Sequence, residues 1–469
     1  MIRPTRHPLQ LISPPPAHKL YSGRREPYNL SAAGMQRRGC ALAVKKRLSR
    51  RKIEKAPMKG RVLHTLSQRP SLTGSGVTLD ALAREAAAGW SQRALIGVPA
   101  GDPGEAGELP GEKVYRLEFG GENKTEETAL GFPVPGMSDV MPYESTRFSQ
   151  MTKEELDSYR SAWRGILARA LDEFRPDIIH AHHAWLLSSL VKELAGDTPV
   201  VVHGHGTDLR QLSLCPHLAD EVREGCGRSD LFVVLHEEHA RLYRAEYGLA
   251  EHQVAVVGAG YSEDLFHCGN ASRERGDSIL YAGKLSESKG VGALLDAFEL
   301  LRARRPGTRL QIAGGGTGEE TERLMERMKT FGEDLVYHGQ VDQPRLAELM
   351  RNCSVFVLPS FFEGLPLVLV EAIACGCRPV CTDLPGVRSG LLPHLPGVLD
   401  TVAMPTMKTV DQPDPDALPG FSKDLSDTLE RALDETPPHS GENPAGLLSP
   451  FTWQAVFGRI ETAWLRLTS

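Results

Sequence analysis

Two glutamates, Glu363 and Glu371, flank a short apolar segment and could together bind an anionic ligand. Glu371 lies in an otherwise apolar run, where an ionised carboxylate is costly unless a partner pairs with it or donates hydrogen bonds to it. We therefore expect Glu371 to face a polar ligand. Glu363 precedes Gly364, where the backbone can approach a ligand closely and the free N–H groups of a helix start favour an anion. The two carboxylates thus bracket a predicted anion site.

A buried strand followed by a helix is predicted to position this pair. Residues 354–360 form a short β-rich apolar run that ends in a proline and a serine, the pattern of a buried strand closed by a turn. Pro366 suits the first position of a helix, because the N–H that it lacks would have no intrahelical partner, and Gly376 suits its end. The residues between them are apolar all round, which is typical of a helix buried inside a domain. Glu371 would lie roughly 7.5 Å along the axis from Pro366, comparable with the reach from a diphosphate to its ribose.

The segment Glu-Gly-Leu-Pro-Leu-x-Leu-x-Glu-Ala-x-Ala-x-Gly resembles the paired-glutamate motif of the family 4 retaining glycosyltransferases, which have the GT-B fold. The resemblance implies that Glu363 and the following backbone at Gly364, Leu365 and Pro366 hold the transferred sugar and its phosphate. It also implies that Glu371 binds the ribose hydroxyls. The alternative is a helix with one solvent-exposed glutamate, since Glu-Gly pairs before helices are common.

Two lysines match the same family at an earlier point of the chain. Lys284 and Lys289, each beside a glycine, resemble the basic pair that neutralises the donor pyrophosphate. Cations beside an anion stabilise the charge that builds on a leaving nucleoside diphosphate, which is the main catalytic contribution available without a metal. The family often has Arg where Lys284 stands, and Lys cannot make the same bidentate contact. The alternative is two solvated loop lysines.

A histidine motif resembles the family in the first half of the chain. His205, Gly206 and Asp208 match its His-Gly-x-Asp segment, whose histidine comes close to the transferred sugar. This resemblance implies a catalytic role for His205 and a substrate contact for Asp208, whereas the alternative is a satisfied histidine at a turn. The chain departs from the family at residues 258–262, where Gly-Ala-Gly-Tyr-Ser replaces Pro-Asn-Gly-Val-Asp, so any role of that asparagine is lost.

A glycine-containing loop at residues 71–79 follows the first predicted strand, residues 62–66. Open α/β sheets bind ligands at the carboxyl ends of their strands. The resemblance implies that Gly74, Ser75 and Gly76 approach the donor diphosphate or the acceptor across the cleft. The alternative is a loop that only turns the chain before a helix over residues 79–88.

Clustered histidines and cysteines raise the question of a metal. His180, His182 and His183 end a predicted strand, but the first two share a strand face and no acidic ligand follows closely, so we interpret them as a polar cleft wall. The eight cysteines show neither disulfide-framework spacing nor paired Cys-x-x-Cys motifs, which indicates reduced thiols. We expect no metal and no cofactor, with the nucleotide-sugar as a co-substrate.

Length and composition limit the possible fold classes. The chain has 469 residues, 41% of them apolar and 24% charged, which is ordinary for a soluble globular protein and too long for one core. The sequence contains no run of 18 or more apolar residues, so no segment is expected to span a membrane. From residue 61 strands and helices alternate, which predicts parallel sheets covered by helices. The fold class is therefore α/β, and the resemblance implies GT-B, with two Rossmann-like domains facing across a cleft.

The first 57 residues differ from the rest. They carry a charge of +12, whereas the whole chain carries −6, and no periodicity supports a helix or strand there. Such a tail could bind nucleic acid or anionic lipid. We favour the interpretation that this segment is an extension without a function, or upstream sequence before a natural start at Met58. We therefore expect no nucleic-acid partner. The segment lacks the apolar core of a signal peptide.

Four regions are predicted. Residues 1–57 form a basic, disordered extension, residues 58–272 the acceptor domain, residues 273–450 the nucleotide-sugar domain, and residues 451–469 a helix that, by resemblance, packs back on the first domain. Residues 273–277 would be the hinge. Residues 132–143 would form a packed loop beside the cleft. Residues 391–421, with six prolines, would form an extended insertion without regular structure.

The resemblance implies a retaining glycosyltransferase of the hexosyltransferase type. It would move a sugar from a UDP- or GDP-sugar to the hydroxyl of a glycan, a lipid-linked or a small-molecule acceptor, forming an α-glycosidic bond. We expect a cytoplasmic protein, with association at the inner face of the membrane left open. The alternatives are a sugar-nucleotide epimerase, a phosphorylase or a non-catalytic nucleotide-sugar-binding protein on the same frame.

Overall fold

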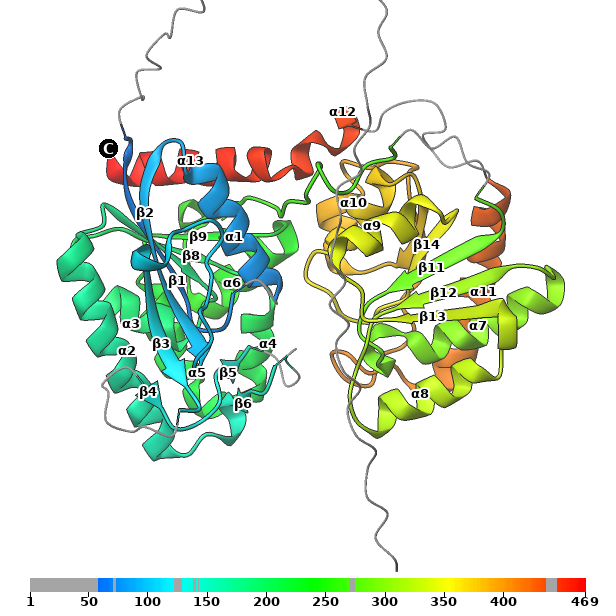
Figure 1. Cartoon of the computed structure of the whole chain (residues 1–469), viewed down its shortest axis with the longest axis horizontal. Helices are drawn as coiled ribbons and strands as arrows, with labels where there is room; N and C mark the ends of the chain where they lie inside the picture. Colours follow the sequence, from blue (N-terminus) through cyan, green and yellow to red (C-terminus); the bar gives the residue numbers. More distant parts are fainter. Residues whose placement is uncertain are drawn as a thin grey trace, which may run out of the picture. The chain divides into compact units, whose positions relative to one another are not determined.

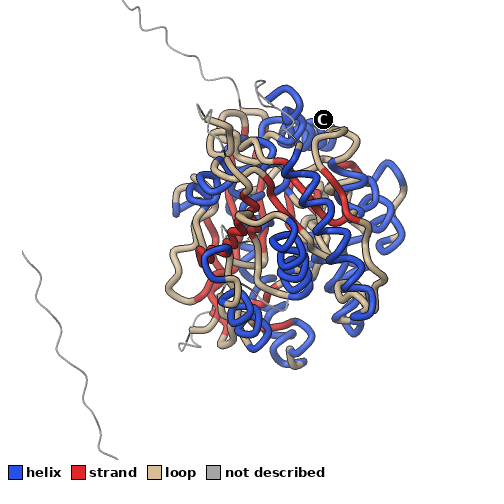
Figure 2. The backbone as a smooth tube through the Cα atoms, turned by 90° about the vertical axis from the view of Figure 1, so that its right-hand side faces the viewer, coloured by secondary structure: helices blue, strands red, loops and turns tan. Residues whose placement is uncertain are grey.

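The computed structural model describes residues 58–70, 73–121, 129–137, 141, 143–269, 275–435 and 445–469. The basic segment of residues 1–57 lies outside the described residues, as do the start of the predicted hinge at residues 273–274 and parts of the two predicted loops at residues 71–72, 138–140 and 142. The described chain contains two large parallel sheets flanked by helices and a small two-stranded sheet of β5 (Pro135–Gly136) and β6 (Thr146–Arg147) (Figures 1 and 2). This is the α/β architecture that the sequence predicts.

The first sheet has eight strands in the order β10-β9-β8-β7-β1-β2-β3-β4, and its neighbouring strands are parallel. Its inner strands read as continuous apolar runs because helices bury both faces. The strands are β1 (Gly60–Leu66), β2 (Trp90–Pro99), β3 (Val114–Phe119), β4 (Ala129–Leu130), β7 (Ile178–His182), β8 (Val200–His203), β9 (Leu231–Val234) and β10 (Val254–Val256). The helices are α1 (Gly74–Ala86), α2 (Lys153–Phe174), α3 (Leu186–Leu194), α4 (Thr207–Leu214), α5 (Pro216–Gly227) and α6 (Glu237–Tyr247).

The second sheet has six parallel strands in the order β13-β12-β11-β14-β15-β16. The chain crosses from one strand to the next through helices, as a doubly wound sheet requires. The strands are β11 (Ser278–Ala282), β12 (Arg309–Ala313), β13 (Leu335–Gly339), β14 (Val355–Leu358), β15 (Arg378–Thr382) and β16 (Asp400–Val402). The helices are α7 (Val291–Arg304), α8 (Glu319–Lys329), α9 (Gln343–Arg351), α10 (Leu367–Ala374), α11 (Leu418–Asp434) and α12 (Ala445–Leu448).

The structure corrects two expectations about local structure. The prediction of a loop up to residue 79 is wrong, because α1 begins at Gly74, where Thr73 caps the helix by accepting a hydrogen bond from the Gly76 N–H. The prediction that residues 391–421 lack regular structure is also wrong. They contain β16, which pairs with β15, and the start of α11, where Pro419 occupies the first turn and needs no N–H partner.

The last helix, α13 (Trp453–Thr468), packs against the elements of the first sheet and contacts α1 and β7 (Figure 1). Trp464 is fully buried, and its indole N–H donates to Nδ1 of His180 at 3.1 Å. Glu461 accepts hydrogen bonds from Lys59 and from the indole of Trp90. The core of the first sheet therefore includes residues from the end of the chain.

Within the described ranges, no helix has the length and apolar character needed to cross a membrane. Among the described residues, Cys226, Cys268, Cys353, Cys375, Cys377 and Cys381 are free thiols, in agreement with the expected reduced state.

Candidate functional site

The carboxyl edge of the second sheet brings two predicted site residues together. Lys289 Nζ lies 2.8 Å from Glu363 Oε1. Lys289 ends the 3-10 turn Glu287–Lys289 after β11, and Glu363 follows β14, the strand that pairs with β11. The backbone N–H of Phe361 donates to the Ser288 carbonyl at 3.0 Å and joins the two turns. A half-buried cation and carboxylate are thus held side by side where open α/β sheets bind ligands.

Gly290 permits this close approach of the two turns. Its φ is +70°, and a Cβ at this position would lie 2.0 Å from the Pro359 carbonyl oxygen. A larger residue would push the Lys289 turn away from the end of β14.

Lys284 lies at the end of β11 and is exposed. Its carbonyl accepts a hydrogen bond from the hydroxyl of Tyr281 at 2.7 Å. Burial, together with the negative charge of Glu363, holds the pKa of Tyr281 well above its usual range. The hydrogen bond from Tyr281 therefore holds the turn that carries Lys284 against β11.

The helix α10 carries the second glutamate of the pair. Pro366 is the residue preceding α10, and the helix begins at Leu367, one position later than predicted. Burial raises the pKa of Glu371 to about 7. A carboxylate in this environment gains from a ligand that donates hydrogen bonds to it.

His205 follows β8 and is held by three other imidazoles. Its ring stacks on that of His203 at 4.5 Å between centroids, and the His183 ring lies 4.7 Å away. Its Nε2 lies 3.1 Å from Nδ1 of His182. The orientation of His205 is therefore set by packing and by a hydrogen bond from the neighbouring strand.

Asp208 is fully buried and holds the His205 loop in place through hydrogen bonds. Its carboxylate accepts hydrogen bonds from the N–H groups of Ala184 at 2.9 Å and His205 at 3.4 Å, and from the hydroxyl of Tyr243. With no exposed surface and three hydrogen bonds from the protein, the carboxylate is not open to a ligand. The predicted substrate contact of Asp208 is therefore corrected to a supporting role for the loop.

The predicted glycine loop is the first turn of α1, so Gly74, Ser75 and Gly76 place helix N–H groups at the end of β1. Gln68 connects this turn to the histidines, because its amide nitrogen lies 2.6 Å from Ser75 Oγ and 3.1 Å from His183 Nε2. His183 has a φ of +68°, which is uncommon for a residue with a side chain and often marks a functional position. Sequence reasoning missed Gln68, because no pattern distinguishes a buried glutamine at a strand end.

The His205 loop and the Glu363 turn touch. A Cβ at Gly364 would lie 3.2 Å from the His205 carbonyl oxygen, and one at Gly206 would lie 3.8 Å from the Gly364 Cα. Nearby, Ser389 Oγ lies 2.9 Å from Nδ1 of His236. The structure thus brings His205 and Gly364 into contact and pairs Glu363 with Lys289.

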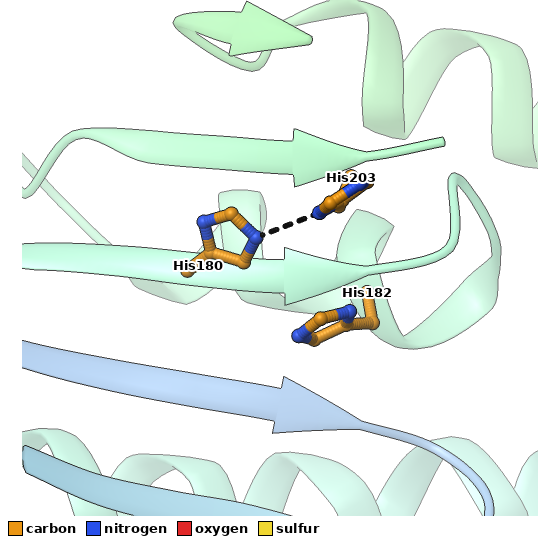
Figure 3. Close-up of side chains that lie close together, drawn as sticks. All are labelled: His180, His182 and His203. Atoms are coloured by element: carbon orange, nitrogen blue, oxygen red, sulfur yellow. Dashed lines mark hydrogen bonds between the residues drawn. The ribbon is translucent and has the colours of Figure 1, made fainter. Parts of the chain in front are cut away.

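His180, His182 and His203 form a buried cluster in which one ring nitrogen of each residue lies within 4.8 Å of the other two (Figure 3). Because His180 and His182 are at most 1% exposed, the prediction that they form a cleft wall is wrong. A metal on Nε2 of His180 would leave a proton on Nδ1, opposite the indole N–H of Trp464, whereas metal-bound histidines usually donate that proton to an acceptor. The arrangement fits a chain of neutral imidazoles: the Trp464 N–H donates to His180, and His180 Nε2 donates to His203 Nδ1 at 3.2 Å.

Two family models match adjacent parts of the chain. The model described as Glycosyltransferase Family 4 matches residues 139–265, and the model described as Glycosyl transferases group 1 matches residues 264–399. The matches divide between the two sheets, and the second contains Lys284, Lys289 and the glutamate pair.

Several curated relatives are 26–34% identical to the chain over the aligned residues. Glycogen synthase of Mycobacterium tuberculosis is 30% identical over 237 residues, which cover 48% of this chain and 56% of the relative. A D-inositol 3-phosphate glycosyltransferase of Xylanimonas cellulosilytica is 29% identical over 350 residues, covering 64% of this chain and 82% of the relative. The chain spans about half the length of the first curated relatives that it matches.

Solved structures share the fold over most of the chain. HepE of Anabaena, solved in complex with UDP-glucose, superposes with a TM-score of 0.55 at 15% identity and covers 86% of this chain and 99% of its own. Sucrose-phosphate synthase of Thermosynechococcus elongatus gives a TM-score of 0.58 at 16% identity, covering 87% and 98%. With its two parallel sheets and its matches to both family models, the chain belongs to the group 1 and family 4 glycosyltransferases of the GT-B fold.

Proposed function

We propose that the protein is a retaining glycosyltransferase that moves a sugar from a UDP- or GDP-sugar to an acceptor hydroxyl and forms an α-glycosidic bond. The observation that carries this proposal is the pairing of Lys289 with Glu363 beside the loop of His205. A cation, a carboxylate and an imidazole at one sheet edge suit a sugar with an anionic leaving group. The complex of Anabaena HepE with UDP-glucose supports a nucleotide-sugar donor.

In the proposed reaction the lysines act on the leaving group. The ammonium groups of Lys284 and Lys289 lie near the charge that develops on the diphosphate as its bond to the sugar breaks. Oxygens of an incoming diphosphate compete with Glu363 for Lys289, which frees the carboxylate to accept hydrogen bonds from sugar hydroxyls. Glu371 accepts from the ribose, and the first turn of α1 offers N–H groups to the phosphates or to the acceptor.

Retention follows from a front-face displacement in this proposal. The bond from the anomeric carbon to the diphosphate oxygen breaks, the acceptor oxygen forms a bond on the same face, and its proton passes to the departing phosphate. The acceptor class is a glycan, a lipid-linked sugar or a small molecule, and the chemistry requires no cofactor and no covalent intermediate. The His205 loop contacts Gly364, and we expect closure of the two domains over a bound donor to exclude water from this step.

The test is a screen of UDP- and GDP-sugars with acceptor pools, in which release of UDP or GDP is measured with and without acceptor. Acceptor-dependent release is expected, and NMR of the product should show an α-linkage from an α-linked donor. Conversion of the donor to another sugar nucleotide would indicate an epimerase. Donor binding, detected as a rise in melting temperature without any turnover, would indicate a binding protein.

A further inference from the structure

His182 is a buried residue that the proposed reaction does not use, yet it contacts His205. Its Nδ1 lies 3.1 Å from Nε2 of His205, and the two rings are tilted by only 17°. His182 ends β7 and His205 follows β8, so the contact joins two neighbouring strand ends. The stacking of His205 on His203 restricts rotation of its ring and maintains this geometry.

The two rings must share one proton between the contacting nitrogens, because burial keeps both imidazoles neutral. Nε2 of His182 is buried and has no hydrogen-bond partner in the part of the chain that the structure describes. A proton on that nitrogen would be a buried, unsatisfied donor, which is rarer in proteins and more costly than an unsatisfied acceptor. The cluster already has one such donor, because the proton of neutral His203 lies on Nε2, which has no partner among the described residues, and a second would add to that cost. The proton of His182 therefore belongs on Nδ1, from which it is donated to Nε2 of His205.

This assignment determines what His205 can offer to a substrate. Because Nε2 of His205 accepts from His182, the proton of the neutral ring is on Nδ1. Nδ1 has no partner among the described residues, and His205 is only half-buried. His205 thus presents an N–H and not a lone pair on its free side.

We propose that His182 is a positioning residue that fixes the tautomer of His205, so that His205 Nδ1–H donates a hydrogen bond to the sugar or to the leaving group. The identity of the ligand in this proposal rests on the proposed function, whereas the assignment of the two tautomers does not. It excludes His205 as a general base, since the nitrogen that could accept a proton is occupied by His182.

Two-bond ¹H–¹⁵N correlation spectra of the ¹⁵N-histidine-labelled full chain test the tautomers directly. The chain has 16 histidines, so the two signals are assigned with the variants His182→Asn and His205→Gln. Both neutral rings are expected to carry the proton on Nδ1. A His205 protonated on Nε2 would overturn the proposal, whatever the activity of the protein.

Kinetics of two matched variants test the positioning role. His182→Asn keeps an amide N–H near the place of Nδ1–H, whereas His182→Leu removes the donor. His182→Leu is expected to lose about tenfold or more in kcat with little change in the donor KM, and His182→Asn to recover most of that loss. Equal kcat values for both variants, at equal folded fractions by circular dichroism, would overturn the proposal. If the wild-type protein has no transfer activity, the proposed function is overturned. The tautomers of His182 and His205 are then tested by the NMR spectra alone.

Discussion

The ammonium group of Lys289 contacts the Glu363 carboxylate at 2.8 Å, across the turns that follow two adjacent strands. Lys289→Met should lower kcat by about 100-fold or more, because it removes a cation placed beside the leaving group. Glu363→Gln should also lower kcat. The fold-loss in kcat of the double variant should be smaller than the product of the two single fold-losses, since both groups act in the same site.

The matched control is Lys329→Met, which removes an exposed lysine whose ion-pair partner among the described residues is Glu326. Its kcat should stay within about twofold of the wild type, since exposed ion pairs contribute little. Additive losses in the Lys289 and Glu363 double variant would contradict a shared role.

The raised pKa of the half-buried Glu371 predicts a pH dependence. Its pKa is about 7 in the folded protein against an ordinary value of 4.5, so the unfolded state releases the proton first. The stability that this group contributes is fully present below pH 4.5 and is lost as the pH rises to about 7, by at most about 3 kcal/mol.

Glu371→Gln should therefore raise the melting temperature of the ligand-free protein more at pH 8 than at pH 5, and should weaken nucleotide binding, because the ribose loses a charged acceptor. Differential scanning fluorimetry at both pH values, with and without UDP and GDP, measures this. The control is Glu326→Gln on the exposed face of α8, where no such pH dependence is expected. An equal effect of Glu371→Gln at pH 5 and pH 8 would contradict the prediction.

Gly386 offers a test of the contact made by the Glu363 turn. Its φ of −65° suits any residue, but a Cβ there would lie 1.9 Å from the Gly364 carbonyl oxygen. Gly386→Ala should displace Gly364 and weaken donor binding by about tenfold or more, measured by isothermal titration calorimetry. Gly420→Ala is the control, because α11 leaves open space at that position, and it should stabilise the protein by up to about 1 kcal/mol. Unchanged affinity in Gly386→Ala would refute the contact.

The last helix should contribute measurably to stability. Trp464→Phe removes the indole N–H that satisfies His180 and leaves a small cavity, so it should lower the free energy of unfolding by about 2–3 kcal/mol. Leu465→Ala, at an exposed position of the same helix, should change it by less than about 0.5 kcal/mol. Urea titration followed by fluorescence and circular dichroism measures both, and similar losses for the two variants would contradict the role of Trp464.

The strands with continuous apolar runs could be predicted from the sequence, because burial on both faces imposes that pattern. The strand β3 is harder to recognise, although Leu117, Glu118 and Phe119 alternate as in a strand, because a stretch rich in Gly and Pro precedes it and favours a loop. The strand β16 has only three residues and is defined by its pairing with β15. Such elements depend on neighbours that are distant in the sequence.

In the candidate site, too, features set by local sequence could be predicted and features set by distant segments could not. The turn at Gly364 and the helix α10 could be predicted from local chemistry, and the resemblance placed Lys289 in the same site as Glu363. The burial of Asp208, and of His180 beneath the last helix, could not be predicted, because it depends on Tyr243 and Trp464 approaching from remote segments. A polar side chain at a strand end looks the same in the sequence whether it faces a ligand or the core.

The packing of Trp464 against β7 also has a consequence for biosynthesis. The core around Val62, Trp90 and Ile178 is completed by Trp464 and its neighbours in α13, which leave the ribosome after the second sheet. The first sheet must therefore keep part of its core open until residues 453–468 have been translated.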